Sequence, residues 1–405
     1  MKILFLTDEF YPNFGANSLL IKTLAGEFVK NKHQVFVMPF TYNDGLPVEE
    51  CWNGIDVVRK IPHDNKKTLF SNLKQGRFLT ALKIGWKCLQ EKCTKKEKVL
   101  RKDRITAREC LKNFIKNNHI DVVVSICCSI ELSFPLLYLR KKNKLPCKWI
   151  FYMIDPFESH NYYRGIEKVS TLRKLQHSIM ERCDKVVATS LIYNDVKEWE
   201  TEEILNKITI VEFPKIKKPV AKSCDDDIVL DKEMINVVCT GSKNEVVRNS
   251  VYTLALCEAM KRENVVFHFI GNGWSEEDYE VKGNCIFYKP HTHQAIQNIQ
   301  TQADFLLNIG NVVVNQLPSK ILEYISTGKP IINVVKSNSC PTLALLQEYP
   351  ALNLFEEKDI QISIEELKTF LTIELNKLDF ECINEKYKIY TPEYVIQQML
   401  DVCKE

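Results

Sequence analysis

The sequence predicts an α/β protein built from two tandem doubly wound halves. Short apolar runs alternate with stretches of helical periodicity along most of the 405 residues. Such an alternation indicates parallel strands joined by helices that cover both faces of a sheet. The alternation breaks once, near 213–234, and then resumes. A chain of this length can bury two separate cores, so we expect two domains.

The first half contains five predicted strands. They are the apolar runs KILFLTD, HQVFVMPF, IDVVVSI, KWIFYMID and KVVATS. The helix after the first run shows Leu20, Leu24 and Phe28 at helical spacing. The apolar stretch 122–139 has almost the length of a membrane span. It also contains Glu131 and Pro135, so we interpret it as a buried strand at 122–127, a turn and a helix.

The second half repeats the pattern with the strands INVVCTGS, VVFHFIGNG, CIFYKP, DFLLNIG and PIINVV, and with helices at 250–262, 292–302 and 319–327. The resulting domains are 1–212 and 235–387, joined by a linker at 213–234. The segment 388–405 is expected to form a helix that packs back on the N-terminal domain. Thr391 is its candidate N-cap, with Pro392 at the first helical position.

Composition excludes several classes of protein. A formal net charge of +3 is too small to indicate nucleic-acid binding. The 15 cysteines include no C-x-x-C pair, so neither a metal site nor a cofactor is predicted. The apolar run at the N-terminus is too short for a signal peptide. We therefore expect a cytoplasmic protein whose cysteines are free thiols.

Ligands of doubly wound sheets bind at the carboxyl ends of the strands, so the loops there are the candidate sites. Gly15 follows the first strand and can bring the backbone close to an anion; a simple tight turn is the alternative. Gly241 follows the first strand of the second half, with Lys243 and Arg248 close by. These cations suit a diphosphate, although a solvated basic loop would look the same.

Asp155 follows a buried strand and precedes Pro156, which ends the strand. A carboxylate in this position could orient a sugar hydroxyl or accept a proton. It could equally cap the following turn. Gly271 and Gly273 follow another strand, and we expect them to shape the wall of the site.

The stretch NQLPSKILEYISTGKPII, 315–332, carries one acidic residue among apolar ones. Ser319 is a candidate N-cap, Lys320 begins the helix, and Gly328 ends it. The free amides of the first turn favour a phosphate. Glu323 lies about one turn further, where a carboxylate suits the two hydroxyls of a ribose. A Glu–Lys pair on a partly exposed helix is the alternative.

These motifs resemble the retaining GT-B glycosyltransferases of family 4, of the capsule, O-antigen and exopolysaccharide kind. The resemblance rests on FYPNFGANSLLIKTLAGEFVKNKHQVFVM, TGSKNEVVRNS, FIGNG and NQLPSKILEYISTGKPII, in this order along nearly the whole chain. It implies two Rossmann-like domains facing a cleft. It also implies transfer from a nucleotide-diphosphate sugar to a saccharide or lipid-linked saccharide acceptor, without a metal. Glu323 matches the second acid of the E-x7-E motif, which contacts the ribose in that family.

The sequence departs from the family pattern at several positions. Asn315 occupies the place of the first E-x7-E acid, which contacts the donor sugar in the family. Gly15 is followed by Ala16 instead of a second glycine. The family's arginine after the glycine falls on Ser242, and its lysine matches Arg248 with a shift of one residue. Ile154 replaces the histidine that often precedes the aspartate at Asp155.

The region 83–116 is rich in lysine and arginine and is preceded by aromatic residues. A basic amphipathic helix of this kind can lie on an anionic membrane, so we expect a peripheral location on the inner face of the membrane. A solvated helix face is the alternative. Two other functions stay open: a GT-B epimerase acting on a nucleotide sugar, and a non-catalytic relative serving as a partner or scaffold.

Overall fold

The computed structural model describes the chain except residues 13, 15, 42–44, 60–104, 128–132, 156–168, 221–227, 244–247, 249, 261–263, 312–315, 319, 336–337, 351, 357–359 and 373–376. The chain divides into two compact units. The first comprises Met1–Pro214 and Pro392–Glu405, and the second comprises Lys215–Thr391. The predicted linker, 213–234, begins beside the point where the chain passes between the units.

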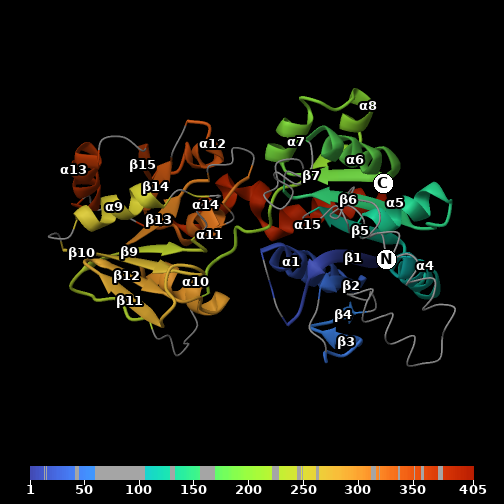
Figure 1. The fold of residues 1–405 in the computed structure, drawn as a ribbon, viewed down its shortest axis with the longest axis horizontal. Helices are drawn as coiled ribbons and strands as arrows, with labels where there is room; N and C mark the ends of the chain where they lie inside the picture. Colours follow the sequence, from blue (N-terminus) through green and yellow to red (C-terminus); the bar gives the residue numbers. More distant parts are fainter. Residues whose placement is uncertain are drawn as a thin grey trace, which may run out of the picture. The chain divides into compact units, whose positions relative to one another are not determined.

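The first unit is an eight-stranded sheet with helices on both faces (Figure 1). Its strand order is β3-β4-β2-β1-β5-β6-β7-β8, and only β3 runs antiparallel to its neighbour. The elements are β1 (Lys2–Glu9), α1 (Ala16–Lys30), β2 (Gln34–Thr41), β3 (Glu49–Trp52), β4 (Ile55–Val58), α4 (Ile105–Asn118), β5 (Val122–Cys127), α5 (Phe134–Lys141), β6 (Lys148–Met153), α6 (Val169–Arg182), β7 (Lys185–Ala188), α7 (Ser190–Val196), α8 (Glu202–Leu205), β8 (Ile208–Ile210) and α15 (Pro392–Lys404).

Alternate side chains of β1 enter two separate cores, as expected for a strand covered on both faces. Ile3 and Phe5 pack with α1 and α15, while Leu4 and Leu6 pack with α4, α5 and α6. The terminal helix begins at Pro392, as the sequence predicts, and packs against α1. Buried side chains of both helices share one core, which fixes α15 on the first unit.

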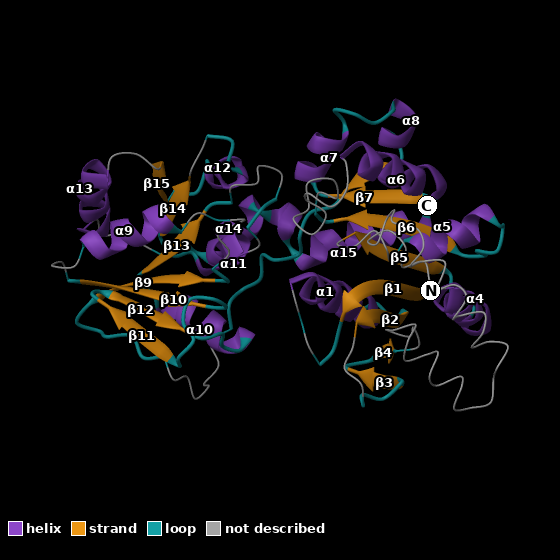
Figure 2. Ribbon diagram, viewed as in Figure 1, coloured by secondary structure: helices purple, strands orange, loops and turns teal. Residues whose placement is uncertain are grey.

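The second unit is a seven-stranded sheet in the order β11-β12-β10-β9-β13-β14-β15, with only β11 antiparallel (Figure 2). Its elements are β9 (Ile235–Thr240), α9 (Val251–Ala259), β10 (Val265–Ile270), β11 (Tyr279–Lys282), β12 (Cys285–Tyr288), α10 (His293–Gln302), β13 (Phe305–Ile309), α11 (Lys320–Thr327), β14 (Ile331–Val335), α12 (Pro341–Leu346), β15 (Leu352–Glu356), α13 (Ile360–Thr372), α14 (Phe380–Lys386) and the 3₁₀ turn η2 (Lys388–Tyr390).

Helices α9 and α13 cover one face of this sheet. Helix α10 contacts β9, and α11 contacts α10 and β13. The strand order reverses at β9, with β10 on one side and β13 on the other. This reversal is the switch point at which α/β sheets bind ligands, outside the carboxyl ends of the strands. The second unit therefore directs attention to the loops after β9 and β13 and to the start of α11.

The structure confirms the predicted α/β class and the predicted strands of both halves. The stretch 122–139 forms strand β5 and helix α5, and the residues between them lie outside the described ranges. No helix in the described parts of the chain is long and apolar enough to cross a membrane. The described cysteines are free thiols, and most of them are buried.

Candidate functional site

The site is organised around the buried carboxylate of Glu323. It lies in the first turn of α11, a helix whose residues Ile321–Thr327 are all buried. The helix ends at Gly328, whose φ of 72° is easily reached only by glycine. Glu323 itself is only 9% exposed. A charged group buried to this extent needs polar partners, because loss of hydration destabilises the ion.

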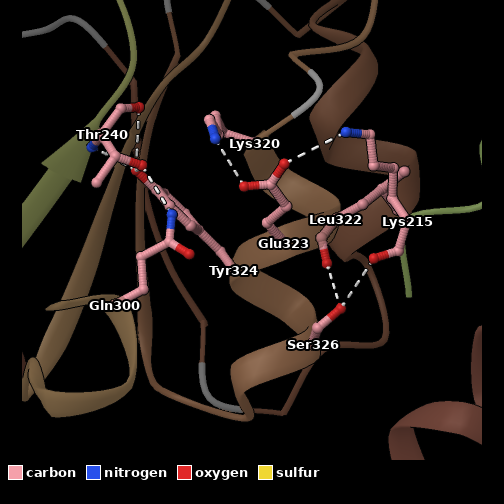
Figure 3. Close-up of polar contacts among 8 residues, drawn as sticks. All are labelled: Lys215, Thr240, Gln300, Lys320, Leu322, Glu323, Tyr324 and Ser326. Carbon is pink, nitrogen blue, oxygen red and sulfur yellow. Dashed lines mark hydrogen bonds and ion pairs between the residues drawn. The ribbon is translucent and has the colours of Figure 1, made fainter. Parts of the chain in front are cut away.

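Two lysines supply these partners (Figure 3). The Lys320 ammonium lies 2.7 Å from Glu323 Oε2. The Lys215 ammonium lies 3.4 Å from Glu323 Oε1. Lys320 comes from the same helix, whereas Lys215 comes from the segment that begins the second unit. Each carboxylate oxygen therefore has its own cation.

The balance of these effects keeps Glu323 ionised. Burial by itself raises the pKa of the carboxyl group. The positive charges of Lys320 and Lys215, a hydrogen bond from Lys320 and a contribution from His293 outweigh burial, so the pKa of Glu323 falls below its usual value. The carboxylate is therefore a charged acceptor near neutral pH, and each oxygen keeps a further lone pair for a ligand hydroxyl.

Arg248 and Lys320 meet beside the glycine that follows β9. Gly241 has a φ of 122°. A Cβ at Gly241 would lie 3.2 Å from Arg248 Nη1 and 3.9 Å from Lys320 Cγ. Arg248 Nε donates a hydrogen bond to Asn311 Oδ1 at 3.2 Å. Asn311 in turn donates to the Gln316 carbonyl oxygen at 2.8 Å, so the loop after β13 holds the guanidinium group.

The loop after β10 packs tightly against Gly241. The Gly241 amide donates to the Ile270 carbonyl at 2.9 Å, and Trp274 Nε1 donates to the Gly241 carbonyl at 2.7 Å. A Cβ on Gly271, whose φ is 148°, would overlap the Gly241 carbonyl. Only glycine fits this close approach of two backbones. This loop therefore packs against the glycine that lies beside Arg248 and Lys320.

A buried neutral network joins α11 to the end of β9. The Tyr324 hydroxyl accepts a hydrogen bond from the Thr240 amide at 2.7 Å and lies 3.1 Å from Thr240 Oγ1. Gln300 Nε2 donates to the same hydroxyl of Thr240 at 2.8 Å (Figure 3). Because Tyr324 follows Glu323 and Thr240 precedes Gly241, the network fixes the carboxylate relative to the cationic loop.

The structure thus brings together four of the residues singled out from sequence: Gly241, Arg248, Lys320 and Glu323. Lys243 is exposed, and its ammonium lies 5.7 Å from the centre of the Trp274 ring. Asp155 lies two residues beyond β6 in the first unit and is half-buried. Three further candidates, Gly15, Asn315 and Ser319, lie outside the described residues.

Sequence reasoning missed Lys215 and Asn311. Both contact a predicted site residue from a distant part of the chain, separated by 108 positions for Lys215–Glu323 and by 63 for Asn311–Arg248. Lys215 lies where the sequence indicates only a linker. Asn311 follows the end of a predicted strand. This position at the carboxyl edge of the sheet was the one feature of the sequence that could have indicated Asn311 as a site residue.

The arrangement combines cations for a multiply charged anion with a charged acceptor for hydroxyl groups. Arg248 can contact phosphate oxygens through two donors, and Lys320 adds a point charge. The positive end of the dipole of α11 favours an anion at the start of this helix, although the Ile321 amide donates to the Pro318 carbonyl at 3.1 Å. Among the described residues, no group of three or more histidine, cysteine, aspartate or glutamate side chains could hold a metal ion.

Comparison with known proteins places the fold. No family model and no curated protein sequence matches the chain. Among solved structures, sucrose-phosphate synthase from Thermosynechococcus elongatus superposes with a TM-score of 0.64 at 12% identity, covering 100% of this chain and 98% of the other. WaaG, a glycosyltransferase involved in lipopolysaccharide biosynthesis, superposes with a TM-score of 0.60 at 12% identity, covering 97% of this chain and 98% of the other.

A third neighbour has a different activity. UDP-GlcNAc 2-epimerase from Methanocaldococcus jannaschii superposes with a TM-score of 0.57 at 9% identity, covering 100% of this chain and 99% of the other. Two parallel-dominant α/β sheets that match these structures over the full length define the GT-B fold. The fold class predicted from sequence is therefore confirmed. At this level of identity the likeness establishes the fold, and function must be argued from the site.

Proposed function

We propose that this chain is a retaining glycosyltransferase that moves a sugar from a nucleotide-diphosphate sugar to a saccharide or lipid-linked saccharide acceptor in the synthesis of a surface polysaccharide. The observation that carries the proposal is the grouping of Arg248 and Lys320 beside the ionised, buried Glu323. Cations for a diphosphate and an acceptor for a ribose diol are the two features that a nucleotide-diphosphate donor requires. The GT-B neighbours support sugar transfer in general.

In this proposal the residues of the second unit bind the donor. Arg248, Lys320 and Lys243, with the amides of α11, balance the charge of the diphosphate and stabilise it as it leaves. These groups replace a metal ion in that role. Glu323 accepts hydrogen bonds from the ribose, and the amide of Asn315 contacts a hydroxyl of the donor sugar. Ser319, which lies outside the described residues, remains the N-cap predicted for the helix on which Lys320 and Glu323 lie.

The first unit would then provide the acceptor side. Asp155 follows a strand end, where its carboxylate can orient the acceptor hydroxyl or accept its proton. Gly15 allows the backbone of the first loop to approach the donor. We assign no covalent nucleophile, so retention would rest on positioning and on electrostatic stabilisation of the leaving phosphate.

The proposal is tested by incubating the protein with a panel of nucleotide-diphosphate sugars in the presence of EDTA. We expect one donor to raise the melting temperature and to be slowly hydrolysed, since water can replace the acceptor. The anomeric configuration of the released sugar, read by NMR, reports retention. A protein that neither binds nor hydrolyses any donor would contradict the proposal. Activity that requires an added divalent metal would contradict the metal-independent part.

An epimerase is the second candidate, because a GT-B epimerase is among the structural neighbours. The same incubation separates the two functions. An epimerase would return a nucleotide sugar of changed configuration without releasing the nucleotide. A non-catalytic partner or scaffold would at most show a thermal shift, with the donor unchanged.

The basic region 83–116 would bind the anionic inner face of the membrane, near a lipid-linked acceptor. Only its last part, within α4, lies among the described residues. There Leu111 and Phe114 face the core, while Lys112 pairs with Glu109 at 3.3 Å. Each lysine or arginine near an anionic surface contributes about 1 kcal/mol, screened by salt. Co-sedimentation at low salt should favour anionic over neutral vesicles; equal binding would leave the region as a solvated helix face.

A further inference from the structure

Lys215 lies where the chain enters the second unit, and its backbone is held from two sides. The chain passes between the units at Pro214–Lys215 and again at Thr391–Pro392. The amides of Lys215 and Ile216 both donate to the Tyr390 carbonyl, at 2.9 and 3.0 Å. On the other side, the Ser326 hydroxyl, which donates mainly to the Leu322 carbonyl at 2.8 Å, lies 3.4 Å from the Lys215 carbonyl (Figure 3). These contacts hold Lys215 against helix α11.

The side chain of Lys215 reaches from this point to the candidate site. It is 16% exposed, and its ammonium lies 3.4 Å from Glu323 Oε1 (Figure 3). A lysine rarely becomes this buried without an anionic partner. The other carboxylate oxygen is occupied by Lys320 at 2.7 Å. The two lysines approach different oxygens and so fix the rotation of the carboxylate, while lone pairs on both oxygens remain available.

We propose that Lys215 is a positioning residue of the donor site, which keeps the Glu323 carboxylate charged and oriented so that its remaining lone pairs receive the ribose hydroxyls. This inference rests on the proposed function, in which Glu323 recognises the ribose. It adds to that site a residue from the segment that begins the second unit at Lys215, which we call the crossover segment. Lys215 acts through Glu323 and is not itself required to touch the donor.

The electrostatics of the site give the proposal a measurable consequence. Burial raises the pKa of Glu323, and three groups from three elements oppose it: Lys320 on α11, Lys215 on the crossover segment and His293 on α10. Without Lys215, burial meets less opposition. Glu323 should then take up a proton at a higher pH than in the parent protein. A protonated carboxyl group loses acceptor capacity for a diol.

The test compares nucleotide binding by the parent and by Lys215→Met, which keeps the length of the side chain and removes its charge. UDP, GDP and ADP are first screened by calorimetry. The nucleotide that binds is then compared with its 2′-deoxy analogue between pH 8 and pH 5.5. The ratio of the two affinities isolates the contact to the 2′-hydroxyl, because titration of the phosphates affects both nucleotides equally.

Lys218→Met is the matched control. Lys218 lies three residues further along the same segment, is 68% exposed, and pairs with Glu381 at 3.2 Å instead of with Glu323. We expect the parent and Lys218→Met to prefer the ribonucleotide by roughly tenfold to a hundredfold across this pH range. In Lys215→Met the preference should be smaller at pH 8 and should approach unity as the pH falls. Lys215→Arg, which keeps the charge, should restore a preference that does not change with pH.

The outcomes separate this inference from the function on which it rests. If the parent does not discriminate between the two nucleotides, Glu323 does not recognise the ribose, and both proposals fail. If the parent discriminates and Lys215→Met matches it at every pH, only the role of Lys215 is overturned. Should Lys215→Met fail to fold, Lys215→Gln is measured in the same way and judged by the same pH profile.

Discussion

Two buried glutamates, one in each unit, have different polar partners that compensate for the loss of hydration. Glu323 in the second unit is 9% exposed and has a lysine ammonium at each oxygen. Glu212 in the first unit is 6% exposed and accepts a hydrogen bond from the Ser190 amide at 2.9 Å. The charge of Glu212 contributes, after burial, to raising the pKa of the buried Tyr152 hydroxyl.

The difference distinguishes a carboxylate held by the main chain from one held by two lysine side chains. A main-chain amide at the start of a helix is fixed by the fold, so the partner of Glu212 cannot move away without local unfolding. Lysine side chains are flexible and can share a carboxylate with a ligand or leave it. Burial alone therefore does not identify a functional acid; the nature of its partners is the more informative observation.

The largest expected effect comes from replacing Glu323 by glutamine, with Glu212→Gln as the comparison. Glu323→Gln turns one acceptor oxygen into a donor and removes the negative charge between two lysines. We expect the preference for a ribonucleotide over its 2′-deoxy analogue to disappear, at a cost of about 1.5–3 kcal/mol in binding. Calorimetric titration of both nucleotides measures this. Glu212→Gln keeps an acceptor for the Ser190 amide and should leave binding unchanged.

The contrast between the two glutamates would be wrong if Glu323→Gln and Glu212→Gln had the same effect on nucleotide binding. Equal discrimination by Glu323→Gln and the parent would show that Glu323 is only an ion-pair partner. A loss of binding in Glu212→Gln with an unchanged melting temperature would show that the amide-held carboxylate also belongs to a binding site.

A somewhat smaller effect is expected for Arg248, the cation that faces Gly241. Arg248→Ala removes a charged donor of the proposed diphosphate site. Because Arg248 is half-buried, we expect a loss near the lower end of the range for charged hydrogen bonds, about 1.5 kcal/mol or roughly tenfold in affinity. The loss should be equal for ribo- and deoxyribonucleotides, in contrast to Glu323→Gln. Unchanged affinity would remove Arg248 from the site.

Asn311 should show a smaller effect of the same kind. Asn311→Ala removes the oxygen that accepts from Arg248 Nε at 3.2 Å, so the guanidinium group loses a positioning contact but keeps its charge. A neutral hydrogen-bonding partner contributes about 0.5–1.5 kcal/mol. We expect nucleotide binding to weaken by this amount in Asn311→Ala. The double variant Arg248→Ala, Asn311→Ala should bind the nucleotide as tightly as Arg248→Ala alone. Additive losses would show that Asn311 acts independently of Arg248.

Most of the fold could be predicted from sequence because buried parallel strands leave continuous apolar runs. Two hairpins, β3–β4 and β11–β12, were not predicted as hairpins: β12 was predicted as a strand, whereas β3, β4 and β11 were missed. The first turns at Asn53-Gly54, with φ values of 51° and 79°, and the second pairs Lys282 with Cys285 around Gly283. Both carry the two-residue turn signal of a β-hairpin. The three missed strands have only four residues each, too few to show a clear period.

The site was only partly predictable for a different reason. Glu323, Lys320, Gly241 and Arg248 belong to motifs whose chemistry is visible locally. The partners of these residues are not local, since Lys215 and Asn311 reach the site only once both sheet and crossover have formed. The exposure of Glu323 also depends on this packing. From sequence, a partly exposed Glu–Lys pair was an open alternative; in the structure the pair exists, but it is buried and has a second lysine.

The smallest effect concerns His268, a buried ionisable group of the second unit whose hydrogen-bond partners among the described residues are uncharged. It is 2% exposed, and its Nε2 lies 3.1 Å from Asn236 Oδ1 while its Nδ1 lies 3.2 Å from the Tyr288 hydroxyl. The Asn236 amide nitrogen donates to the Asp231 and Met234 carbonyls, which leaves Oδ1 to accept from an Nε2–H. The hydrogen bonds therefore suit the neutral imidazole.

Burial lowers the pKa of His268 to about 4. The unfolded chain, with an ordinary histidine, binds a proton at higher pH than the folded protein does, so protonation favours unfolding. The contribution to stability is complete above the unfolded pKa and is lost as the pH falls from about 6.5 towards 4. Between pH 8 and pH 6 we expect a loss of about 0.8 kcal/mol from this residue. The pH dependence of urea unfolding should become flatter by this amount in His268→Phe. Neighbouring cations keep Glu323 charged, whereas burial keeps His268 neutral. An equal pH dependence in His268→Phe and the parent would contradict that distinction.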